Sequence, residues 1–75
     1  MGEKEQQNAK DLWNAIQRAG GELPEFWEIS IVIENGAAWV FLSNDMDAVE
    51  FPSNQDSLAE AINDAVAFAL EKGGA

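Results

Sequence analysis

Carboxylates are the side chains of this sequence whose type and number could do chemistry. The chain of 75 residues has 14 Asp and Glu, 4 Lys and Arg, and neither His nor Cys. Paired carboxylates can act as acid and base at a glycosidic bond, but a chain without His lacks the commonest general base and metal ligand. So short a chain also leaves little room for an enclosed cleft. We therefore expect no enzymatic activity, no metal and no cofactor.

The charge distribution indicates the kind of partner. The formal net charge is −10, and the segment from Ala19 to Glu71 contains eleven carboxylates but no Lys, Arg or His. A field of this sign repels nucleic acid and anionic membranes and attracts basic surfaces. We expect a basic protein surface as the partner, and direct contact with neither nucleic acid nor a membrane.

The turn at residues 44–47 is where carboxylates come closest to a metal-binding motif. Asn44, Asp45 and Asp47 are similar to a fragment of a calcium loop, yet the spaced Asp run, the Gly and the Glu at position 12 are missing. Asn and Asp also favour turns because their side chains hydrogen-bond to nearby backbone groups. A turn stabilised in this way is the simpler interpretation.

A single domain over residues 1–75 is expected to begin and end with an amphipathic helix. The first helix covers residues 5–19 and should end at Gly20-Gly21, because glycine commonly terminates helices. Residues 1–5 are expected to be disordered. The apolar stripe of this helix consists of Ala9, Leu12, Trp13 and Ile16.

The second helix has a polar start and a glycine-rich end. Ser53 and Ser57 are alternative caps, the latter in a capping box with Glu60. The helix should continue to residue 71, and residues 72–75 should form a frayed tail.

Three strands between the helices complete an α+β fold. Asn35-Gly36 is the strongest short hairpin signal, because both residues tolerate the positive φ of a type I′ turn. It joins strands at residues 26–34 and 37–43. A third strand at residues 48–51 should end at Pro52. The expected order is α-β-β-β-α, a three-stranded antiparallel meander with two helices packed on one face.

The two-residue loop also predicts which side chains share a face of the sheet. The core should be centred on Ile31, Val40, Ile62 and Val66. No element obviously covers the opposite face, which is an apolar patch with a rim of carboxylates and therefore a candidate protein-binding surface. A covering helix or loop, or a shifted register, is the alternative. The candidate residues are Val32, Trp39, Phe41, Glu28 and Glu34.

The acidic side of the second helix is another candidate surface. Asp56, Glu60 and Asp64 form like-charge pairs at i,i+4, each of which costs about 0.3 kcal/mol. A solvated face that serves solubility would carry the same residues. Together with the preceding turn and strand, the acidic partner-binding candidates are Asp45, Asp47, Glu50, Asp56, Glu60 and Asp64.

The element order resembles that of the double-stranded RNA-binding domain, which places lysines at the start of its second helix to grip phosphates. The matching residues 53–57 include one acid and no base, so RNA binding is not implied. In size, acidity and compact αβ build, the chain is similar to small phage-encoded inhibitors that mimic DNA, such as anti-CRISPR and anti-restriction proteins. That resemblance implies carboxylates presented to the basic channel of a nucleic-acid-binding protein.

Two functions are therefore expected to compete. The first is a non-enzymatic inhibitor that occupies a basic, nucleic-acid-binding surface. The second is a small interaction domain that uses the sheet face or the open edge of the first strand, the latter favouring a homodimer. The polar N-terminus and the lack of a membrane-length apolar run favour a cytoplasmic protein.

Overall fold

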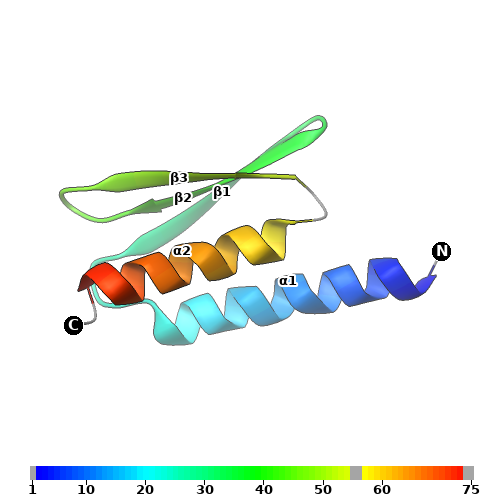
Figure 1. Cartoon of the computed structure of the whole chain (residues 1–75), viewed down its shortest axis with the longest axis horizontal. Coiled ribbons are helices and arrows are strands. Elements are labelled where there is room, and N and C mark those ends of the chain that lie inside the picture. The colour runs from blue at the N-terminus through cyan, green and yellow to red at the C-terminus, as the bar shows by residue number, and fades with distance from the viewer. Residues whose placement is uncertain (1, 55–56, 74–75) are drawn as a thin grey trace.

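The computed structural model describes residues 2–54 and 57–73, and the side chains of this part from Lys10 onward. The expected α-β-β-β-α order is confirmed, with a three-stranded antiparallel sheet in the order β1-β2-β3. Both helices lie on one side of the sheet, with α2 next to it and α1 alongside α2 (Figure 1). The elements are α1 (Gly2–Glu22), β1 (Glu28–Glu34), β2 (Ala37–Ser43), β3 (Ala48–Ser53) and α2 (Leu58–Gly73).

The predicted register of the hairpin is confirmed. Ile31 lies opposite Val40, and Val32 lies opposite Trp39. The turn itself differs from the type I′ form that we expected, because Gly36 has a φ of 80° while Asn35 has no positive φ. Glycine alone therefore provides the left-handed residue that this turn requires.

The ends of two strands were predicted wrongly. β1 begins at Glu28 rather than at residue 26, because Phe26 has a φ of 76° and extended backbone requires a negative φ. Trp27 there donates its backbone N–H to the carbonyl of Pro24 at 3.2 Å. β3 continues through Pro52 to Ser53, which is tolerated because β3 is an edge strand.

The helix ends also differ from expectation. α1 passes through Gly20 and Gly21 to Glu22, since glycine inside a helix costs only about 1 kcal/mol. α2 begins at Leu58 and extends to Gly73. Before it, the side-chain oxygen of Asn54 accepts the backbone N–H of Ser57 at 3.0 Å. The expected disorder of residues 1–5 and fraying of residues 72–75 stay predictions, although the helical ranges include residues 2–5 and 72–73.

The core lies between α2 and the two strands that it covers. Its largest fully buried side chains are Leu42, Ile62, Val40 and Val66. Ile31 was expected among them, but it is 39% exposed because α2 packs on β2 and β3. The buried side of α1 was predicted only in part. Leu12 packs against the core, but from Lys10 onward the buried residues of this helix are Ala15 and Ala19, whereas Trp13 and Ile16 are 59% and 42% exposed.

Trp27 closes one end of this core. It packs against the buried cluster, and its indole lies so close to Gly73 that a Cβ at this position would overlap the ring.

Among the described residues, no helix has the length and apolar character required to cross a membrane.

Candidate functional site

The face of the sheet opposite the helices brings together the predicted apolar patch. Trp39 lies in the middle strand, with Val32 of β1 on one side and Pro52 of β3 on the other. In the next row, Phe41 lies between Ser30 and Glu50. Figure 1 shows both helices on the other side of the sheet. The half-buried rings of Trp39 and Phe41 thus lie at the centre of this face.

Carboxylates surround these rings on the same face. Glu28 lies opposite Ser43 and Glu34 lies opposite Ala37, so both flank the patch from β1. Glu50 flanks it from β3 as the neighbour of Phe41. All three carboxylates are exposed. We define the outer face as this surface: Val32, Trp39, Phe41, Pro52, Glu28, Glu34 and Glu50.

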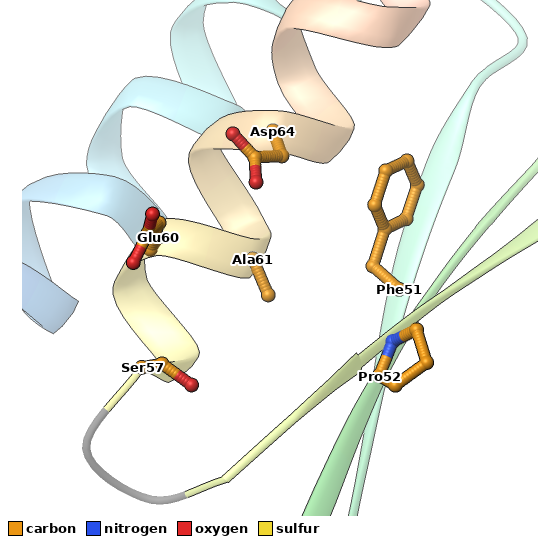
Figure 2. Close-up of a pocket in the computed structure, with 6 residues that line it drawn as sticks. All are labelled: Phe51, Pro52, Ser57, Glu60, Ala61 and Asp64. Atoms are coloured by element: carbon orange, nitrogen blue, oxygen red, sulfur yellow. The ribbon is translucent and has the colours of Figure 1, made fainter.

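Glu60 and Asp64 lie together on α2, in agreement with their i,i+4 spacing. Both are exposed, and both line a shallow cleft of about 270 Å³ with Phe51 and Pro52 of β3. Figure 2 shows the two carboxylates on neighbouring turns, with Phe51 and Pro52 across the cleft. Asp56, the third predicted acid of this group, lies outside the described residues.

Asp45 and Asp47 lie at the other end of α2. Asp47 lines a hollow with Phe68 and Lys72, near the C-terminus of that helix. The Lys72 ammonium lies 5.8 Å from the centre of the Phe68 ring, which is a cation–π distance. The five described acids of the six predicted therefore do not form one continuous surface. They lie at three separate places: Asp45 and Asp47 in the turn, Glu50 on the outer face, and Glu60 and Asp64 on α2.

The turn at residues 44–47 has the local hydrogen bonds expected for its Asn and Asp content. The side-chain oxygen of Asn44 accepts the backbone N–H groups of Met46 at 2.8 Å and Asp47 at 2.6 Å. The backbone N–H of Asn44 donates to the carbonyl of Asp47 at 2.9 Å. Within the described part of the chain, no group of three or more His, Cys, Asp or Glu is placed to hold a metal ion.

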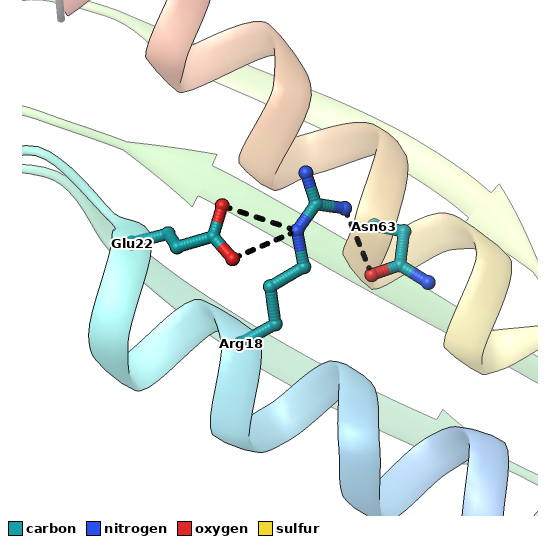
Figure 3. A network of polar contacts seen from close by, with 3 residues as sticks. All are labelled: Arg18, Glu22 and Asn63. Carbon is teal, nitrogen blue, oxygen red and sulfur yellow. Dashed lines mark hydrogen bonds and ion pairs between the residues drawn. The ribbon is translucent and has the colours of Figure 1, made fainter.

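Arg18 links the two helices. Its Nε lies 3.4 Å from the Glu22 carboxylate, and its Nη1 donates to the side-chain oxygen of Asn63 at 3.1 Å. Figure 3 shows the guanidinium of α1 between Glu22 and the α2 residue Asn63. The i,i+4 spacing of Arg18 and Glu22 is readable from the sequence, whereas the contact with Asn63 depends on how the helices pack. Arg18 thus provides a polar link beside the small alanines through which α1 contacts α2.

Pro52 was missed as a member of the outer face. The sequence predicts that the third strand ends at this proline, and it does not predict the register of β3 with β2. The signal that could have found it is the alternation of Val49, Phe51 and Ser53, which leaves Glu50 and Pro52 on the opposite side.

Comparison with known proteins adds nothing to this assignment, because no family model, curated protein or solved structure matches the chain.

Proposed function

We propose that this protein is a small, non-enzymatic, cytoplasmic binding protein whose outer face contacts a basic surface of a partner, a nucleic-acid-binding protein being the expected class. The observation that carries this proposal is the arrangement of Trp39 between Val32 and Pro52, on a sheet face to which neither helix is packed. Three exposed carboxylates lie around this centre.

The two parts of the outer face have different physical roles. Large aromatic side chains provide most of the binding energy in many interfaces, because they remove a large apolar area from water at a small cost in entropy. Charged groups at the rim mainly accelerate association and select partners of opposite charge. Trp39 would therefore provide affinity, whereas Glu28, Glu34 and Glu50 would select a basic surface.

The chain has a matched control for testing Trp39. Trp13 is also solvent-accessible, with 59% exposure, but it lies on α1 away from the outer face. The tagged protein would be used to capture partners from host lysate, and the dissociation constant of the purified partner would then be measured. We expect Trp39→Ala to weaken binding by about 30-fold or more, as for a central interface aromatic, and Trp13→Ala to leave it within about threefold.

A loss of binding in Trp13→Ala with normal binding in Trp39→Ala would contradict the proposal. Circular dichroism of both variants checks that each is folded. The same measurement at low and at moderate salt separates the roles, since the association rate should fall as salt is added while the contribution of Trp39 is retained.

Nucleic-acid mimicry is the second candidate function. The specific observation in its favour is the exposed pair Glu60 and Asp64, which lines one cleft on successive turns of α2. A carboxylate pair of this kind can form ion pairs with Lys and Arg side chains that otherwise bind phosphates. In this case the partner would bind either the protein or its nucleic acid, but not both.

Competition and charge reversal test mimicry directly. Glu60→Lys with Asp64→Lys should abolish competition with nucleic acid, while Glu25→Lys with Glu71→Lys, a control with the same change in charge, should preserve most of it. Equal loss in both double variants would mean that total charge, and not the α2 pair, is responsible. Competition that depends on Trp39 but not on Glu60 and Asp64 would leave the outer face as the binding surface.

A further inference from the structure

Strand β1 exposes the inner side of the sheet as well as its edge. Its inward-facing residues Ile31 and Ile33 are 39% and 62% exposed. Their cross-strand neighbours on the same face, Val40 and Ala38, are 0% and 1% exposed. The difference arises because α2 packs mainly on β2 and β3. β1 also has a strand on one side only, so its other backbone edge is open to pairing.

An apolar groove runs beside this open edge. It has a volume of about 200 Å³ and is lined by Ile16 of α1, Leu23 just after this helix, Ile29 and Ile31 of β1, and Ile62 of α2. Ile16 is itself 42% exposed. A strand added beside β1 would place alternate side chains over this groove.

The charges along β1 indicate which kind of segment would bind this edge. Glu28 and Glu34 are the two ends of the strand, and both are exposed on the outer side. Glu25, just before the strand, is exposed as well, while the nearby Arg18 is already bonded to Glu22 and Asn63. A strand with Lys or Arg opposite both glutamates would form cross-strand pairs of opposite charge, which stabilise a sheet.

A second copy of this chain fits the edge less well. Antiparallel pairing of two β1 strands about Ile31 places Glu28 of one copy opposite Glu34 of the other, twice, and like charges directly opposite are destabilising. A shift of two residues separates the carboxylates but leaves Ile33 and Glu34 without a strand partner. In either register two chains of charge −10 must approach each other.

We propose that the edge of β1 and the adjoining groove bind an extended, basic segment of a partner protein, which adds as a fourth strand. The segment has apolar side chains at three alternate positions, beside Ile29 and Ile31, which line the groove, and beside Ile33 on the same side of the sheet. It has Lys or Arg at two positions six residues apart, opposite Glu28 and Glu34. This site shares Glu28 and Glu34 with the outer face, but its apolar contacts lie on the other side of the sheet, and it does not depend on the function proposed for the outer face.

A synthetic peptide of seven residues tests the proposal with the intact protein. The peptide has lysine at both ends and alternating valine and threonine between them, in the order Lys-Val-Thr-Val-Thr-Val-Lys. One control peptide has glutamate in place of both lysines. Another has proline in place of the central valine and of the threonine after it, which keeps the charge but removes an N–H that faces β1, because N–H groups of neighbouring residues in a strand point in opposite directions. We expect saturable binding of the first peptide and, for each control, affinity lower by at least about tenfold.

Two neighbouring substitutions locate the binding surface. Ile33→Lys introduces a cation on the inner side of β1, two residues from the groove-lining Ile31, whereas Val32→Lys introduces the same charge on the outer face, and both positions are exposed in the native chain. Ile33→Lys should weaken peptide binding by about tenfold or more, and Val32→Lys should leave it within about threefold. Amide exchange of residues 28–34 in the wild-type protein should slow when the peptide is bound.

Four results would overturn the proposal. Two concern the substitutions: Val32→Lys weakens peptide binding as much as Ile33→Lys does, or weakens it more. Two concern the peptides: a control peptide binds as tightly as the lysine peptide, or the lysine peptide does not bind the wild-type protein. If the wild-type protein sediments as a dimer and the Ile33→Lys variant sediments as a monomer, the edge of β1 instead binds a second copy of this chain. If Ile33→Lys proves unfolded, the exchange of residues 28–34 in the wild-type protein decides between these outcomes.

Discussion

Phe26 is the residue at which the backbone carries local strain. Its φ of 76° lies in the left-handed region, which costs a residue with a Cβ roughly 1–2 kcal/mol. The ring is 73% exposed, so little packing offsets this cost. The conformation lets the chain turn between Pro24 and Trp27, which places the indole against Gly73 and starts β1 at Glu28.

We predict that Phe26→Gly raises the free energy of unfolding by about 0.5 kcal/mol. The relief of strain should exceed the extra entropy that glycine gives the unfolded chain, which is roughly 0.4–1 kcal/mol. Urea denaturation measures the change. Glu25→Gly, one residue earlier and without a positive φ, is the control and should lower stability. A decrease for Phe26→Gly as large as that for Glu25→Gly would show that the ring contributes packing that its exposure does not suggest.

At the scale of elements, the position of α2 decides which isoleucines are core residues. Ile62 of α2 is 1% exposed, while Ile31 of β1 is 39% exposed. We predict that Ile62→Ala lowers the free energy of unfolding by about 2–5 kcal/mol, because it leaves a cavity. Ile31→Ala should cost about 1 kcal/mol, since much of its side chain is already in water. Equal losses in denaturation experiments would mean that β1 is covered as fully as β2.

Much of the element structure could be predicted from the sequence because its signals are local. The alternation along β1 and β2 and the position of Asn35-Gly36 determine the pairing and hence the face that carries Trp39. The coverage of β1 could not be predicted in this way. The alternating pattern is the same whether or not a helix lies over Ile29, Ile31 and Ile33. Whether β1 is covered depends on how the helices pack, with α1 on α2 rather than on the sheet.

The same distinction explains the error on α1. Leu12, Trp13 and Ile16 form an apolar stripe at helical spacing, which predicts the buried side of the helix, but of these three only Leu12 packs against the core. In the structure the contact with α2 uses the small residues Ala15 and Ala19, because small side chains let two helices approach closely. Periodicity counts large apolar residues, so it placed Trp13 in the core and did not identify the alanine side.

At the scale of the whole molecule, the thin shape and the large net charge both lower the stability of the fold. The Cα atoms extend over 42 × 24 × 14 Å, and both helices lie on one side of a small sheet (Figure 1). A domain of this size buries a limited fraction of its surface. Self-repulsion of a charge of −10 further reduces the stability that this burial provides.

We predict that NaCl stabilises the protein against urea. Raising the salt concentration from about 0.01 M to about 0.3 M screens repulsion between exposed carboxylates and should increase the free energy of unfolding by about 1 kcal/mol. The variant with Glu60→Lys and Asp64→Lys has a smaller net charge and should show a weaker salt dependence. A wild-type stability that falls as salt is added would mean that attractive pairs such as Arg18 with Glu22 outweigh the repulsion.

The strand β1 has the same pattern of residue types in both chain directions. From Glu28 to Glu34 it reads acid, isoleucine, small or branched, isoleucine, small or branched, isoleucine, acid, with Ile31 at the midpoint. Sheet edges accept parallel as well as antiparallel strands, with different hydrogen-bond spacing. A basic segment and its reversed sequence would therefore meet the same order of charges and apolar contacts. Partner segments for this edge should accordingly be sought in both reading directions, and a pair related by reversal should compete for the same strand.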